Sequence, residues 1–149
     1  MGDEEVYYLD TSALVKRYVS ESGSEIVDRI FSSAYRGISM VSFSYWNIAE
    51  AAVVFDKYER RLGINAQRLL RSLLRETKTL TKLHRLIIIS ISPSILREAI
   101  GLILKHHIYV ADALQVASAV RSQCTSFVTG DKDLASIAKA EGLKILYTK

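Results

Sequence analysis

Short apolar runs alternate with longer helical stretches along this chain of 149 residues. Strand-like runs cover residues 6–9, 38–41, 86–91, 126–129 and 144–147. The run 86–91 consists almost entirely of isoleucine and leucine, which is typical of a strand that is covered on both faces. Because helical segments separate successive strands, the pattern predicts an α/β fold. We expect a three-layer sandwich with a short, mostly parallel central sheet of about four to five strands flanked by helices.

Helices are predicted over residues 11–19, 23–35, 44–62, 65–83, 93–105, 112–122 and 134–140. Their boundaries carry local signals: Ser42 or Ser44 can cap the third helix, Gly63 separates the third from the fourth, and Pro93 is suited to a first helical position. No linker, repeat or low-complexity segment interrupts the pattern. We therefore expect residues 1–149 to form a single domain.

Four acidic residues stand out against this pattern: Asp10, Glu50, Asp112 and Asp131. Asp10 and Asp131 end apolar runs, so both are expected at the carboxyl edge of the sheet, where ligands bind in parallel α/β folds. Glu50 and Asp112 lie within apolar, alanine-rich helical segments, where carboxylates are usually avoided. We expect all four carboxylates to converge at one place.

Converging carboxylates repel one another, by roughly 1 kcal/mol per pair at 4 Å in water and more inside a protein, unless a cation neutralises them. Oxygen-rich sites suit Mg²⁺ or Mn²⁺, whereas the His and Cys residues lack the spacing of a zinc site. Such a metal can activate water and stabilise a phosphoryl transition state. Each acid also has a purely structural interpretation, since Asp10, Asp112 and Asp131 could serve as helix caps and Glu50 could face solvent.

The composition fits an enzyme that acts on a polyanion. The net charge is +4, and without the four acids the chain carries 20 Lys/Arg against 12 Asp/Glu. A basic body around an acidic pocket suits a polyanionic substrate, although a merely soluble basic protein has the same totals. No apolar run reaches the roughly 18 residues of a membrane span, so no membrane partner is expected. The acidic start of the chain does not resemble a signal peptide, and the single Cys124 fits a reducing cytoplasm.

Three segments, Tyr8–Leu14, Asp112–Ala119 and Phe127–Leu134, resemble the three signature blocks of PIN domains. Their order, their spacing and the total length resemble the VapC-type toxins of prokaryotic toxin–antitoxin pairs. The resemblance implies a Mg²⁺- or Mn²⁺-dependent endoribonuclease that leaves 5′-phosphate and 3′-hydroxyl ends. It also implies a homodimer and an antitoxin that covers the active-site groove.

Carried over by position, the resemblance makes Asp10, Asp112 and Asp131 the metal ligands, with Glu50 positioning metal-bound water. Ser12 and Thr129 match positions where the family often has a hydroxyl near the metal. Asp133 lies just beyond the fourth acid and is expected to assist through water.

A row of basic residues occupies the predicted helix 65–83. Arg68, Arg71, Arg75, Lys78 and Lys82 are spaced three or four apart and therefore share one helix face, opposite Leu69, Leu73 and Leu80. This face could contact RNA phosphates, dock an acidic antitoxin segment, or simply face solvent.

Two further interpretations stay open from the sequence. A non-catalytic PIN-like module that binds RNA or protein would explain the basic row without chemistry, and it need not bind Mn²⁺. A phosphoacceptor receiver domain also uses clustered acids with Mg²⁺, but it expects adjacent acids after the first strand, where this chain has Thr11 and Ser12. The pair His106–His107 is interpreted as a surface or helix-end pair rather than a metal site.

Overall fold

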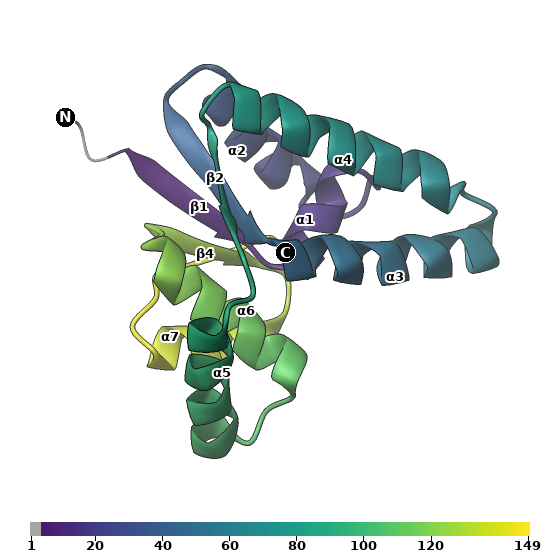
Figure 1. Cartoon of the computed structure of the whole chain (residues 1–149). Coiled ribbons are helices and arrows are strands. Elements are labelled where there is room, and N and C mark those ends of the chain that lie inside the picture. Colours follow the sequence, from purple (N-terminus) through teal and green to yellow (C-terminus); the bar gives the residue numbers. More distant parts are fainter. Residues whose placement is uncertain (1–3) are drawn as a thin grey trace.

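A five-stranded, all-parallel sheet forms the centre of the molecule, with strand order β3-β2-β1-β4-β5 (Figure 1). The strands are β1 (Glu5–Leu9), β2 (Ser39–Ser44), β3 (Leu86–Ile89), β4 (Ser126–Thr129) and β5 (Ile145–Tyr147). The computed structural model describes residues 4–149, so part of the acidic start that was compared with a signal peptide lies outside the described residues. The predicted α/β architecture is confirmed, and the sheet is wholly rather than mostly parallel.

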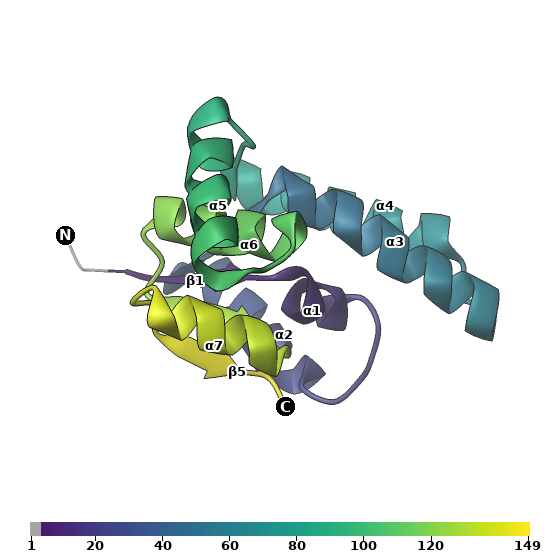
Figure 2. The ribbon, with the colours of Figure 1, turned by 90° about the horizontal axis from the view of Figure 1, so that it is seen from below.

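Helices cover both faces of the sheet. The helices are α1 (Thr11–Leu14), the 3₁₀ turn η1 (Val15–Arg17), α2 (Ser24–Tyr35), α3 (Tyr45–Leu62), α4 (Ala66–Lys82), α5 (Pro93–His106), α6 (Val110–Ser122) and α7 (Lys132–Ala140). Figures 1 and 2 show α5, α6 and α7 on one side, while α1, α2 and the paired helices α3 and α4 lie on the other. Among residues 4–149, no helix is both long enough and apolar enough to cross a bilayer.

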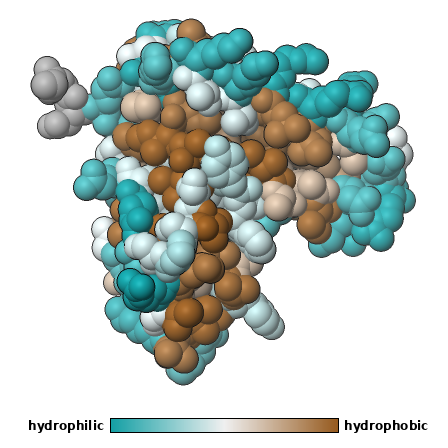
Figure 3. Space-filling model, viewed as in Figure 1, coloured by the Kyte–Doolittle hydropathy of each residue, from teal (hydrophilic) through white to brown (hydrophobic). Residues whose placement is uncertain are grey.

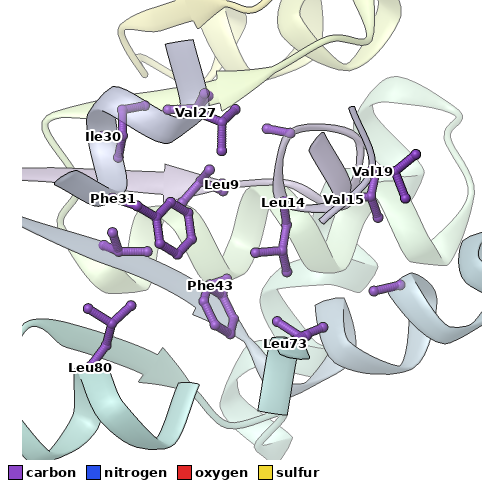
Figure 4. Packing of buried hydrophobic residues seen from close by; sticks show 14 of the residues in the cluster. Leu9, Leu14, Val15, Val19, Val27, Ile30, Phe31, Phe43, Leu73 and Leu80 are labelled. Atoms are coloured by element: carbon purple, nitrogen blue, oxygen red, sulfur yellow. The ribbon is translucent and has the colours of Figure 1, made fainter. Parts of the chain in front are cut away.

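The strands bury alternate side chains on opposite faces, as the period of two in a β-strand requires. Leu9, Phe43 and Val128 pack against the helices α1 to α4, as Figure 4 shows for Leu9 beside Phe31 and for Phe43 beside Leu73. Tyr8 and Phe127 point to the other face, where their rings stack with centroids 5.8 Å apart. The sheet therefore separates two hydrophobic cores, which is the predicted three-layer sandwich.

Helices α3 and α4 form a long hairpin that extends away from the sheet (Figure 1). Of the two caps that the sequence left open, Ser42 and Ser44, it is Ser44 that caps α3, through a capping box with Asn47. Gly63 ends α3 in the left-handed conformation, and the Asn65 side chain then caps α4 by accepting a hydrogen bond from Arg68 N.

A half-buried ionic cluster ties this hairpin to the rest of the fold. Arg17 donates two hydrogen bonds to the carboxylate of Glu76 on α4, each 2.9 Å long, and its guanidinium lies over the Phe31 ring. The hydroxyls of Tyr18 and Tyr35 donate to the same carboxylate. Although burial alone would raise it, the pKa of Glu76 is lowered by these donors and by the charge of Arg17.

One close approach packs the end of the chain against the loop before α2. Gly23 has a φ of +94°, and a Cβ placed there would lie 1.9 Å from the carbonyl oxygen of Thr148. Thr148 is buried, and its N–H donates to the Thr129 carbonyl. Only glycine therefore fits at position 23.

Several predicted boundaries differ from the observed ones. The strand predicted at 38–41 runs from Ser39 to Ser44, because its last residues pair with β3. The helix predicted over 11–19 is split into α1 and a 3₁₀ turn, and the strand predicted over 86–91 ends at Ile89. Helix α6 begins at Val110, two residues earlier than predicted. Asp112 therefore lies in its first turn and is not its cap. Tyr109 occupies the N-cap position and makes no side-chain capping hydrogen bond.

Candidate functional site

Asp10 lies at the carboxyl end of the central strand β1, and its side chain is 2 % exposed. It caps the short helix α1 by accepting a hydrogen bond from Ala13 N at 2.9 Å. The Ser12 hydroxyl donates to Asp10 Oδ1 at 2.7 Å, and the Thr129 hydroxyl donates to Oδ2. The capping role that the sequence left open for Asp10 is therefore real, but two further donors converge on the same carboxylate.

The electrostatic state of Asp10 follows from its depth. Burial raises the pKa of Asp10 to about 6, because a carboxylate loses hydration inside the protein. The hydrogen bonds from Thr129, Ser12 and Ala13 N oppose this rise, and the nearby charge of Asp131 adds to it. Asp10 is thus held by three donors and has no cationic partner among the described residues.

The loop that follows β4 orients both hydroxyls. Asp131 N donates to the Thr129 hydroxyl at 3.0 Å, and Gly130 N donates to the Ser12 hydroxyl at 2.9 Å. Because each hydroxyl oxygen already accepts from a backbone N–H, its proton is directed to Asp10. The Asp131 side chain caps α7 by accepting from Asp133 N and Leu134 N, so its predicted capping role is also real.

Asp112 and Glu50 face this edge from two helices. Burial is the main cause of a raised pKa at Asp112 in the first turn of α6. The negative charges of Asp131, Glu50 and Asp133 raise it further. Since Asp131 also raises the pKa of Asp10, it interacts with both Asp10 and Asp112, and Glu50 joins this group through Asp112.

Glu50 on α3 is held by two side chains that the sequence analysis did not assign to the site. The Thr11 hydroxyl donates to Glu50 Oε1 at 2.7 Å, and the Gln115 amide donates to the same oxygen at 2.6 Å. Gln115 lies three residues after Asp112 on α6, so the two share a helix face. Glu50 on α3 is thereby hydrogen-bonded directly to α6, the helix that carries Asp112.

A buried polar network continues behind Glu50. The Gln115 amide oxygen accepts from Asn47 Nδ2 at 2.9 Å and from the Tyr8 hydroxyl at 3.1 Å. Asn47 Nδ2 also donates to the Thr11 hydroxyl, and Asn47 Oδ1 accepts from Ser44 N at 2.7 Å. Asn47, Gln115 and Tyr8 are all nearly inaccessible to solvent.

A sequence signal for these residues existed. The chain contains only five Asn and Gln residues, and two of them lie one helical turn from a candidate acid: Asn47 three before Glu50, and Gln115 three after Asp112. Both stand among apolar neighbours, where an amide has to find buried partners. An amide at this spacing within an apolar helix face therefore indicates a residue that supports the site.

The donor set fits a hard divalent cation. Carboxylates and hydroxyls supply only oxygen ligands, and none of Asp10, Glu50, Asp112 and Asp131 forms an ion pair with a basic side chain in residues 4–149. As the side chains stand, no group of three or more His, Cys, Asp or Glu within this range is close enough to hold a metal. A cation at this edge would draw the acids closer by removing their mutual repulsion.

The remaining candidates are distributed as follows. Asp133 is exposed in the first turn of α7. The five basic residues of the predicted row on α4 are Arg68, Arg71, Arg75, Lys78 and Lys82. All five are exposed, on the face opposite the buried Leu69, Leu73 and Leu80. None of them forms an ion pair within the described chain. His106 ends α5 and bonds to Glu141, consistent with a helix-end residue.

Comparisons with known proteins bear on this fold. The family model described as "PIN domain" matches residues 7–140. Similar solved structures include the toxin VapC20 of Mycobacterium tuberculosis, described as cleaving the sarcin–ricin loop, with 16 % identity and a TM-score of 0.66; it covers 92 % of this chain and 95 % of its own.

VapBC2 of Rickettsia felis, solved with a promoter DNA fragment, has 19 % identity and a TM-score of 0.66, covering 97 % of this chain and 99 % of its own. A toxin–antitoxin complex of Klebsiella pneumoniae has 19 % identity and a TM-score of 0.58; the match covers 96 % of this chain and 98 % of that chain. At these identities the structural likeness concerns the fold. No curated protein matches the sequence.

Proposed function

Because the chain belongs to the PIN domain family, we propose that it is a metal-dependent endoribonuclease and the toxin of a type II toxin–antitoxin pair. The observation that supports the proposal is that Asp10, Glu50, Asp112 and Asp131 form one electrostatically connected group, and that none of them pairs with a basic side chain in residues 4–149. An uncompensated carboxylate group of this kind suits a divalent cation and a phosphodiester substrate. The structural neighbours, which include the toxin VapC20 and toxin–antitoxin assemblies, favour the same class.

Each residue has a proposed role. Asp10, Asp112 and Asp131 would hold Mg²⁺ or Mn²⁺, and Glu50 would orient the attacking water. The bound cation would supply a stronger nucleophile and charge stabilisation at the phosphate. Ser12 and Thr129 orient the Asp10 carboxylate through the hydrogen bonds described above. Asp133, exposed beside Asp131, would act through water. Hydrolysis would leave 5′-phosphate and 3′-hydroxyl ends.

The proposed protein partners are an antitoxin and a second copy of the chain. Exposed apolar side chains on the α3–α4 hairpin, including Val53, Leu62 and Leu74, offer an antitoxin a binding surface. On α5, the exposed Ile100 and Leu104 lie four residues apart on one face, which supports a homodimer. Figure 3 shows hydrophobic surface both between the α3 and α4 helices and along α5. A cytoplasmic location, where an RNA target is available, is part of the same proposal.

The test is cleavage of a defined single-stranded RNA by purified protein with Mn²⁺, with EDTA, and by the variant Asp112→Asn. The matched control is Asp56→Asn, which removes an exposed acid from α3. We expect cleavage that requires both the metal and Asp112 and that survives in the control. Activity retained by a clean preparation of Asp112→Asn would contradict the role of this residue.

Other outcomes discriminate between the proposed function and its alternatives. Mn²⁺ binding without cleavage of any RNA tried would indicate a narrow target. Neither metal binding nor cleavage would favour a non-catalytic module that binds RNA or protein.

A further inference from the structure

We propose that Gln115 is a positioning residue, which aims the Glu50 carboxylate at Asp10, Asp112 and Asp131 through a relay of buried amides. The proposal rests on the proposed nuclease function of this site. Its basis is the direction of the hydrogen bonds along the relay. A backbone N–H at one end and a carboxylate at the other each allow only one orientation of the two amides.

One end of the relay is a backbone donor. Ser44 N can only donate, so the group of Asn47 that lies 2.7 Å from it must be the amide oxygen. The amide nitrogen of Asn47 is then directed to Gln115 Oε1, at 2.9 Å. This contact requires the amide nitrogen of Gln115 to point the other way.

The opposite end of the relay is a carboxylate. An ionised Glu50 can only accept, and the Gln115 nitrogen lies 2.6 Å from its Oε1. The orientation of the Gln115 amide that follows from the Ser44 N–H is thus the one that the Glu50 carboxylate requires. A flipped amide at either Asn47 or Gln115 would place two oxygen atoms, or two N–H groups, against each other inside the protein.

Thr11 closes the relay into a network. Its hydroxyl accepts from both amides, Asn47 at 3.1 Å and Gln115 at 3.2 Å, so its own proton is directed to Glu50 Oε1. Both donors therefore hold the same carboxylate oxygen. Among the described residues, no donor bonds to Glu50 Oε2, which leaves this oxygen for the site.

The network also opposes a repulsion. Glu50 and Asp112 are like charges whose interaction raises the pKa of Asp112. Gln115 belongs to the same helix as Asp112 and bonds directly to Glu50, so it fixes the separation of the two acids. Because Gln115 and Asn47 are almost completely buried, water does not replace a lost bond without rearrangement.

A double-mutant cycle tests the proposal, using Gln115→Met, Glu50→Ala and the double variant on the full chain. Second-layer residues at metal sites typically contribute 10–100-fold, so we expect Gln115→Met to lower kcat by about that factor with little change in KM for RNA. In the Glu50→Ala background, the same substitution should lower kcat by less than about twofold, because its effect acts through Glu50. Losses that multiply in the double variant would overturn the proposal.

Gln115→Glu provides a second variant that keeps the buried side of the relay satisfied. One carboxylate oxygen still accepts from Asn47 and Tyr8, while the N–H bonds to Glu50 and Thr11 are lost and a second carboxylate oxygen faces Glu50. We expect the same fall in kcat with the same dependence on Glu50. The control Ser122→Ala removes a buried hydroxyl at the far end of α6, bonded only to Ala119 O, and should retain wild-type kcat.

Measuring the Mn²⁺ dissociation constant without RNA separates this proposal from the proposed function. If the wild type binds Mn²⁺ but cleaves none of the RNAs tried, the cycle is evaluated on metal affinity instead of kcat. A loss of affinity in Gln115→Met that disappears in the Glu50→Ala background supports the positioning role. An equal loss in both backgrounds, or no loss, refutes it, and a wild type that binds no Mn²⁺ refutes both proposals.

Discussion

The Thr129 hydroxyl donates a hydrogen bond to Asp10 Oδ2, although the two residues are 119 positions apart in the sequence. Strands β1 and β4 are neighbours in the sheet, with Leu9 paired to Val128. The residues that follow this pair, Asp10 and Thr129, therefore reach the same edge of the sheet. This bond opposes the effect of burial, which otherwise makes the Asp10 carboxyl harder to ionise.

Replacing Thr129 with valine is expected to raise the pKa of Asp10 above its value of about 6. Valine keeps the shape of threonine but removes the donor that favours the ionised carboxylate. The measurement is an NMR titration of the Asp10 carboxyl carbon in metal-free protein. Thr129→Ser, which retains the hydroxyl, should stay close to the wild type. An unchanged or lower pKa in the valine variant would show that the bond does not stabilise the carboxylate.

Asp10→Asn is expected to stabilise the metal-free protein at pH 7.5 while abolishing the proposed activity. Because the folded-state pKa of Asp10 is raised from 3.8 to about 6, its contribution to stability is complete below pH 3.8 and is lost as the pH rises through about 6. A shift of this size corresponds to roughly 2–3 kcal/mol. Asparagine removes the charge and can still accept from Ala13 N at the helix cap.

Thermal unfolding of Asp10→Asn and wild type at pH 3.5 and pH 7.5 checks this prediction. The variant should unfold at a higher temperature at pH 7.5, and the difference should be small at pH 3.5. A variant that is less stable at both values would mean that the lost hydrogen bonds outweigh the removed charge.

Gly23→Ala is expected to destabilise the fold by more than about 3 kcal/mol, because the new methyl group would overlap the Thr148 carbonyl. Gly37→Ala is the matched control. Gly37 also has a positive φ, of +75°, but a Cβ added there would meet no atom within 4 Å, so only the backbone strain of about 1 kcal/mol remains. Urea unfolding of both variants gives the comparison, and equal losses would disprove the clash.

Glu76→Gln is expected to cost about 2–4 kcal/mol near neutral pH, since it leaves Arg17 without its half-buried partner. The folded-state pKa of Glu76 is lowered, so this stabilisation is present above the unfolded value near 4.5 and is lost as the pH falls through the folded value. The difference between variant and wild type should therefore shrink in acid. Glu98→Gln, at an exposed ion pair with Arg121, should cost far less at any pH.

The basic row on α4 is expected to bind RNA phosphates. The triple variant Arg71→Gln, Arg75→Gln, Lys78→Gln should weaken RNA binding and reduce the salt slope of the logarithm of the binding constant by about 2, at about 0.7 for each lost phosphate contact. The control is a second triple variant with the same change in net charge outside α4: Arg29→Gln, Arg36→Gln, Arg97→Gln. Equal effects of the two triple variants would indicate net charge rather than a contact surface.

Much of this architecture could be predicted from the sequence, because the β/α alternation is strong and each strand is a short apolar run. Asp10 and Asp131 could be placed at one edge since both directly follow a strand in a parallel sheet. Strand ends were predicted less well, as at Ser44, because pairing with a neighbouring strand extends a strand beyond its apolar residues.

The support for Glu50 could not be predicted in the same way. Gln115 and Asn47 are separated by 68 positions, and their hydrogen bond depends on how α3 and α6 pack on the sheet. Helical periodicity places each amide on a face of its own helix but does not show which face meets which. Tertiary contacts of this kind require the structure.

The position of β1 at the centre of the sheet has a consequence for biosynthesis. Strand β1 pairs on one side with β2. Its other edge stays unpaired until β4 is made, more than one hundred residues later. Long-range parallel pairing is slow because the intervening loop must close first. Asp10 and Asp131 therefore meet only after residues 126–131 have left the ribosome and paired. A nascent or truncated chain that lacks them has no Asp131 and no Thr129 bond to Asp10, so the proposed nuclease site is incomplete during synthesis.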